Sequence, residues 1–90
     1  MDEESIISEK VIEVVSSIAR INPDQLDVSD KLQDPPLRMN SQDIVFLTMA
    51  INQLIEDYND NGPIPDSFVK NRNLTAQDLI DKVIEIINLP

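Results

Sequence analysis

The sequence contains no cysteine, no histidine and no tryptophan, and it has a single glycine among its 90 residues. Without cysteine the chain can form no disulfide, no thiolate zinc site and no thiol nucleophile of its own. Without histidine it lacks the commonest general base at neutral pH. We therefore expect that the chain is not an enzyme by itself.

Basic residues are also scarce, because 7 Lys and Arg stand against 17 Asp and Glu, which gives a net charge of -10. Such a chain is repelled by phosphate backbones and anionic membrane surfaces, so we expect no nucleic acid partner and look instead to basic protein surfaces. No apolar run approaches the about 20 residues of a membrane-spanning helix, which predicts no membrane insertion. The N-terminus MDEESII is acidic where a signal peptide is basic, which favours a cytoplasmic location.

The rest of the composition is that of one small folded domain covering residues 1–90. Hydrophobic residues make up 41% of the chain and charged residues 27%, so the acidity does not imply disorder. A chain of this length buries roughly 60–65% of its unfolded surface in one modest core. We expect a monomer with a single core.

Apolar periodicity predicts an all-α fold, a small bundle of three main helices plus one short helix. The first helix is expected over residues 3–19, with apolar residues at helical spacing: Ile7, Val11, Val14, Val15 and Ile18. The second helix begins near residue 41 and carries a core stripe about 80° wide: Ile44, Leu47, Thr48, Ile51, Ile55 and Tyr58. A short turn or helix is expected at residues 66–69. The last helix opens with a Thr75–Asp78 capping pair and buries Leu79, Ile80, Val83, Ile84 and Ile87.

The long loop between the first two helices, residues 20–39, is unusual for a compact domain. Within it, Asn22 and Pro23 predict a single helical turn, since they suit the cap and the first helical position. A loop of this length must pack through its own apolar residues or serve a function. Four residues could anchor it: Leu26, Val28, Leu32 and Leu37.

The segment after the second helix reproduces the first half of a calcium-binding loop, D-x-N-x-N-G, with Asp57, Asn59, Asn61 and Gly62. The twelfth position of such a loop needs a bidentate glutamate and here holds Phe68. We therefore interpret the segment as a polar loop that ends a helix.

Ser41 lies where a proline-containing loop meets the second helical pattern, and the residues alone allow two interpretations. In the first, Asn40 or Ser41 caps the helix, and Asp43 in the first turn is favoured by the helix dipole. In the second, the exposed hydroxyl carries a phosphate ester, which the positive end of the helix and its unpaired N–H groups would stabilise.

The stretch LRMNSQDIVFLTMAI, residues 37–51, resembles the LGxDSLDxVELxMAL signature of acyl carrier proteins. The positions that match are Leu37, Ser41, Asp43, Val45, Leu47, Met49 and Ala50. Further along, Ile64-Pro65-Asp66 is similar to the IPD segment of that family, and the expected helices fall at compatible distances, so the resemblance covers essentially the whole chain.

The resemblance implies that Ser41 receives a 4'-phosphopantetheine arm from coenzyme A. A separate magnesium-dependent phosphopantetheinyl transferase would attach the arm, and its terminal thiol would hold acyl groups as thioesters. The implied partners are the transferase and acyl-transferring, synthase or ligase enzymes. The reactive thiol then belongs to the prosthetic group, so the chain needs no cysteine of its own. The pathway is expected to be a specialised lipid or secondary-metabolite pathway rather than general fatty acid biosynthesis.

The chain departs from the family signature around the serine. Asn40 stands where the family has aspartate, Gln42 where it has leucine, Arg38 where it has glycine and Phe46 where it has an acid. At about 100° per residue, part of the second helix forms a solvent strip opposite the core stripe, namely Gln42, Phe46, Met49 and Gln53. We predict that a partner recognises this region through Asn40, Gln42, Asp43, Phe46, Met49 and Gln53. The apolar pair, Phe46 and Met49, is expected to make the binding less sensitive to salt.

Two alternatives stay open at this point. The chain could be an unmodified helical protein-interaction module in which Ser41 only caps a helix, an interpretation that Asn40 and Gln42 favour. It could also carry amino acids or polyketide intermediates, since such carriers share the serine and differ in their partners. If the cargo is sheltered, the expected interior pocket lies beside Ile44, Thr48, Ile51, Phe68 and Ile80.

Overall fold

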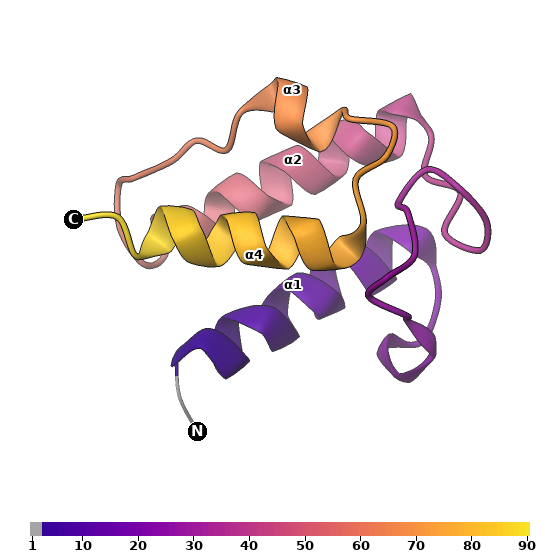
Figure 1. The fold of residues 1–90 in the computed structure, drawn as a ribbon, viewed down its shortest axis with the longest axis horizontal. Coiled ribbons are helices and arrows are strands. Elements are labelled where there is room, and N and C mark those ends of the chain that lie inside the picture. The colour runs from indigo at the N-terminus through magenta and orange to yellow at the C-terminus, as the bar shows by residue number, and fades with distance from the viewer. Residues whose placement is uncertain (1–2) are drawn as a thin grey trace.

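The fold, a computed structural model that describes residues 3–90, is a small bundle of helices (Figure 1). Its elements are α1 (Glu3–Ala19), a 3-10 turn (Pro23–Gln25), α2 (Ser41–Glu56), α3 (Asp66–Val69) and α4 (Ala76–Ile87). No β-strand is present in this range. The prediction of an all-α bundle with three main helices and one short one is confirmed.

The core lies where α1 packs against both α2 and α4 (Figure 1). Each of the three helices contributes side chains with no solvent exposure, such as Val11, Leu47 and Val83. Burying a side chain of this size stabilises a fold by about 1.5–3 kcal/mol, so the three apolar stripes supply the main driving force for assembly.

The predicted stripes are confirmed at their centres and corrected at their edges. Four residues expected in the core are only half-buried because they lie at the edges of their stripes: Val14, Ile18, Thr48 and Ile84. Tyr58 lies beyond the end of α2 at Glu56, where it is half-buried against the core. Leu54 is 7% exposed and belongs to the core, although we did not predict it there.

The connection between α1 and α2 is packed onto the rest of the protein. Of the four expected anchors, Leu32 and Leu37 are buried, whereas Leu26 and Val28 are half-buried against the core. Met39 is also buried, at 3% exposure. The backbone N–H of Leu32 donates to the carbonyl of Leu74 at 3.0 Å, and the N–H of Gln77 donates to the carbonyl of Val28 at 2.8 Å. These bonds join the connection to the segment that enters α4, so a loop of this length is held along its course.

Local hydrogen bonds shape the rest of the connection. The Asn22 side chain caps the 3-10 turn, as predicted, by accepting from the N–H of Asp24. Further along, the Asp27 carboxylate accepts from the hydroxyl of Ser29 at 2.6 Å and from its N–H at 2.9 Å. These bonds favour the charged form of the carboxylate and lower the pKa of Asp27 from its ordinary value.

Two asparagines of residues 57–62, the segment that resembles half of a calcium-binding loop, bind the end of α4. The Asn59 side-chain amide donates to the carbonyl of Ile87 at 2.6 Å, and the Asn61 amide donates to the carbonyls of Ile86 and Leu89 at 3.1 and 2.7 Å. The last turn of a helix leaves carbonyls without partners, and these amides satisfy them. No group of three or more acidic, histidine or cysteine side chains that could hold a metal occurs among residues 3–90.

We predict that Asn61→Asp destabilises the fold. A carboxylate cannot donate to the two carbonyls, and its charge lies at the negative end of the α4 dipole. The loss is expected to be about 2 kcal/mol in the free energy of unfolding, measured by urea denaturation followed by circular dichroism.

The matched control is Asn71→Asp, the same chemical change in an exposed loop. The side-chain oxygen Oδ1 of Asn71 accepts from the backbone N–H of Asn73, and a carboxylate can keep that bond. Equal losses in the two variants would contradict the role given to Asn61.

Candidate functional site

The first turn of α2 is closed by a reciprocal pair of hydrogen bonds. The Asn40 side chain accepts from the N–H of Asp43 at 2.8 Å, and the Asp43 carboxylate accepts from the N–H of Asn40 at 3.0 Å. Of the two residues that could have capped the helix, Asn40 is therefore the cap, and Ser41 is the first helical residue.

Capping by Asn40 leaves Ser41 exposed and its hydroxyl without a hydrogen bond in the part of the chain that the structure describes. The N–H groups of Ser41 and Gln42 likewise have no acceptor among residues 3–90, since the first turn of a helix offers them no backbone carbonyl and the Asn40 side chain takes only the N–H of Asp43. These donors lie at the positive end of a helix of 16 residues. A serine oxygen is thus accessible to a reagent and lies next to two donors suited to an anion.

A surface cavity of about 420 Å³ adjoins the serine. It is lined by Gln33, Ser41, Ile44, Val45 and Lys70, so α2, the end of α3 and the connection before α2 all contribute. Its lining combines two apolar side chains with a hydroxyl, an amide and an ammonium group, and it includes no carboxylate.

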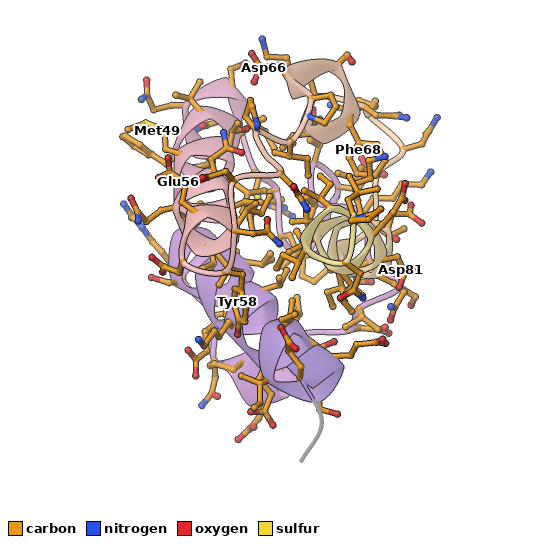
Figure 2. All side chains as sticks on the ribbon, turned by 90° about the vertical axis from the view of Figure 1, so that its left-hand side faces the viewer. Met49, Glu56, Tyr58, Asp66, Phe68 and Asp81 are labelled. Atoms are coloured by element: carbon orange, nitrogen blue, oxygen red, sulfur yellow. The ribbon has the colours of Figure 1, made fainter. Side chains whose placement is uncertain are left out.

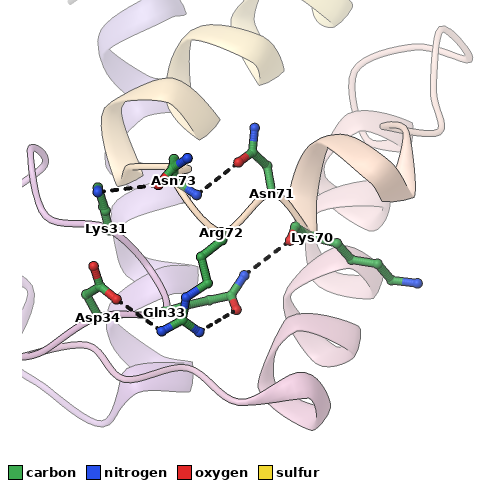
Figure 3. Close-up of polar contacts among 7 residues, drawn as sticks. All are labelled: Lys31, Gln33, Asp34, Lys70, Asn71, Arg72 and Asn73. Carbon is green, nitrogen blue, oxygen red and sulfur yellow. Dashed lines mark hydrogen bonds and ion pairs between the residues drawn. The ribbon is translucent and has the colours of Figure 1, made fainter.

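A cluster of polar side chains fixes one wall of this cavity (Figure 3). The Gln33 amide donates to the carbonyl of Lys70 at 3.3 Å, and its oxygen accepts from the guanidinium of Arg72 at 3.5 Å. Arg72 also pairs with Asp34 at 3.4 Å, and Lys31 donates to the side chain of Asn73. These exposed contacts are individually weak, but together they hold the connection against the segment that follows α3.

Two cations near Ser41 have no acidic partner within residues 3–90. The Lys70 side chain runs away from the polar cluster and passes in front of α2 (Figure 3), where it lines the cavity. Arg38 is exposed and has a positive φ of 49°, a conformation that glycine adopts without the steric cost an arginine bears. The free N–H groups and the lysine form a set of donors that fits a phosphate ester on Ser41.

The predicted strip on α2 faces solvent. Gln42 and Gln53 are exposed, and Phe46 and Met49 are 52% and 64% exposed. Figure 2 shows Met49 on the outer side of α2, pointing away from the other helices. Val45 is also 47% exposed, although we placed it neither on the core stripe nor on the solvent strip.

The other residues expected at the partner surface are held in structural contacts. Asn40 and Asp43 are engaged with each other in the capping pair. Next to Gln53, the Asn52 side chain accepts from the N–H of Ile64 at 2.9 Å and so fixes the loop after α2. A second cavity, of about 620 Å³, begins beside Met49 and Gln53 and has Glu56 and Asp60 on its wall.

The residues of the expected interior pocket are divided between the packed core and separate surface depressions. Ile51 is fully buried, and Ile44 and Ile80 are 4% and 3% exposed in the packed core. Ile44 lines the cavity beside Ser41, whereas Ile80 and Phe68 each line a different surface depression. Figure 2 shows Phe68 on the α4 side of the bundle, and the ammonium of Lys82 lies 5.5 Å from the centre of its ring.

No protein-family model matches the chain, and no curated protein or solved structure is significantly similar to it. The relation to acyl carrier proteins therefore stays a prediction based on the residues quoted above. Among residues 3–90, no helix combines the length and the apolar character needed to cross a membrane.

The capping pair leads to a prediction about Asn40. Asn40→Ala removes the acceptor for the N–H of Asp43 and should lower the free energy of unfolding by about 1 kcal/mol. Asn40→Asp keeps an acceptor at the same place and should retain stability, since a negative charge is favourable at a helix N-terminus. Chemical denaturation of both variants measures this, and equal losses would contradict the assignment of Asn40 as the cap.

Proposed function

We propose that the chain is an acyl carrier protein of the cytoplasm. It holds acyl intermediates as thioesters on a 4'-phosphopantetheine arm attached to Ser41, in a specialised lipid or secondary-metabolite pathway. The observation that carries the proposal is that Asn40 caps α2, which leaves the Ser41 hydroxyl exposed and unengaged beside two free N–H groups. The match of residues 37–51 to the carrier signature supports it.

In this proposal the chain is a substrate of the attachment reaction and not its catalyst. The Ser41 oxygen forms a bond to the phosphorus next to the pantetheine arm of coenzyme A, and the bond from that phosphorus to adenosine 3',5'-bisphosphate breaks. The hydroxyl proton passes to a base of the magnesium-dependent transferase. The chain contributes an accessible oxygen, and it stabilises the new diester through the helix N-terminus and the Lys70 ammonium.

The terminal thiol of the arm supplies the acyl chemistry when the arm is bound. The residues of the chain then have to support the diester and present the arm to partner enzymes. Neither task needs a histidine or a cysteine, which agrees with the composition of the chain.

The proposal is tested by the intact mass of the protein after incubation with coenzyme A, magnesium and a broad-specificity phosphopantetheinyl transferase. We expect the parent chain to gain the mass of one phosphopantetheine and Ser41→Ala to gain nothing. Ser67→Ala is the matched control, because Ser67 is an exposed serine in the first turn of α3, and this variant should be modified like the parent.

Two results would contradict the proposal. One is the absence of any mass gain with several transferases, including that of the source organism, while circular dichroism shows folded protein. The other is a gain that persists in Ser41→Ala.

A second candidate is an unmodified helical protein-interaction module. It is favoured by the apolar surface of α2, where Val45, Phe46 and Met49 are all about half exposed or more. Adjacent exposed apolar side chains on one helix face often mark a contact surface. Both candidates therefore place a partner on this face, and they differ in whether Ser41 carries an arm.

We predict that Phe46→Glu weakens binding of a partner recovered with the chain from its own cells by at least about tenfold, because an apolar anchor is replaced by a charge. The affinity of the parent chain should change little between low and high salt, since apolar contacts are not screened. Calorimetric titration measures both quantities.

The control is Gln77→Glu, which adds the same charge at an exposed position on α4, outside the strip, and should have a small effect. Equal effects of the two variants, or the collapse of parent binding at high salt, would show that charge and not apolar contact governs the surface.

A further inference from the structure

The backbone of Lys70 is held by hydrogen bonds, whereas its ammonium group has no partner in the described part of the chain. Its N–H donates to the carbonyls of Asp66 and Phe68 at the end of α3, and its carbonyl accepts from the Gln33 amide. The chain carries 17 acidic residues against 7 basic ones, so acids are plentiful. A lysine held in this way and left unpaired beside Ser41 is a candidate for binding an anion.

Gln33 also keeps hydrogen-bonding capacity that its present contacts do not use. Its amide nitrogen makes one hydrogen bond, to the carbonyl of Lys70, and its oxygen accepts one, from Arg72. A carboxamide can donate two hydrogen bonds and accept two, so one donor and one acceptor remain. Because the two existing bonds fix the group, it lines the cavity in a set orientation.

The apolar part of the cavity is formed by Val45 and Ile44. Val45 is 47% exposed although its neighbour Ile44 is packed in the core. From Ser41 the lining therefore offers a cation, an apolar wall and a polar amide within one cavity of about 420 Å³.

We propose that this cavity seats the first half of the prosthetic arm, an inference that rests on the proposed function. The arm begins with a phosphate, continues with a carbon that bears two methyl groups, and then reaches a secondary amide. The cavity offers a matching group for each: Lys70 for the phosphate, Val45 and Ile44 for the methyl groups, and the carboxamide of Gln33 for the amide.

Binding of the arm in this cavity determines where the acyl cargo lies. Held across the surface beside α2 and the end of α3, the arm presents its thiol outside the bundle. The core beside the serine is packed, with Ile51 fully buried and Ile80 3% exposed. The cargo is then displayed to partner enzymes and is not stored in the interior.

The experiment compares modified and unmodified protein by nuclear magnetic resonance, with methyl and phosphorus observation. In the modified protein we expect nuclear Overhauser effects from the two methyl groups of the arm to the methyls of Val45 and Ile44. We also expect the phosphorus signal of the diester to differ in chemical shift from that of the same modified protein unfolded in urea, where the diester is intact but the cavity is lost.

Lys70→Ala should abolish the nuclear Overhauser effects and the difference in phosphorus shift. Lys70→Arg should restore the phosphorus shift because it restores the cation. The matched control is Arg38→Ala, which removes an exposed, unpaired cation three residues before Ser41 that does not line the cavity. This variant should keep the nuclear Overhauser effects and the phosphorus shift. Their loss in Arg38→Ala would show that net charge alone is responsible, and would contradict binding of the arm in the cavity.

The outcomes separate this inference from the function on which it rests. A fully modified, folded protein whose arm gives the shifts and narrow lines of the urea-unfolded protein would contradict binding of the arm in the cavity and leave the carrier function intact. A protein that the mass measurement shows to be unmodified at Ser41 would overturn both.

Discussion

The reciprocal hydrogen bonds between Asn40 and Asp43 determine where α2 begins, and the proposed chemistry depends on that position. If Ser41 were the cap, its oxygen would accept a backbone N–H and would be less free to react. Asn40 takes that role, and the burial of Met39 and Leu37 holds the capping residue from the preceding side. The serine is thereby placed at the first helical position, where it is exposed to solvent.

The connection before α2 does more than join two helices. It contributes Leu32 to the core, hydrogen-bonds to the segment that enters α4, and supplies Gln33 to the cavity beside Ser41. Through Gln33 it also binds the residues that follow α3 (Figure 3). A loop that looks too long for a compact domain is therefore a structural part of the candidate site.

The predictable features were those set by contacts near in sequence. The helix starts at Asn22 and Thr75 and the centres of the apolar stripes follow from caps and periodicity. The choice between Asn40 and Ser41 as the cap could not be made locally, because both residue types cap helices well. The contacts of Asn59 and Asn61 with the end of α4 span 25 to 28 residues and leave no local signal. For the same reason, the cavity that joins Gln33, Ser41 and Lys70 was missed.

The most direct test of the account is the state of Ser41 in protein purified from the cells that make it. Trypsin cleaves after Arg38 and Lys70, and the sequence has no lysine or arginine between them, so residues 39–70 form one peptide for tandem mass spectrometry. The account predicts that this peptide carries one phosphopantetheine and that fragmentation places it on Ser41. An unmodified peptide, or a group located on Ser67, would contradict the account.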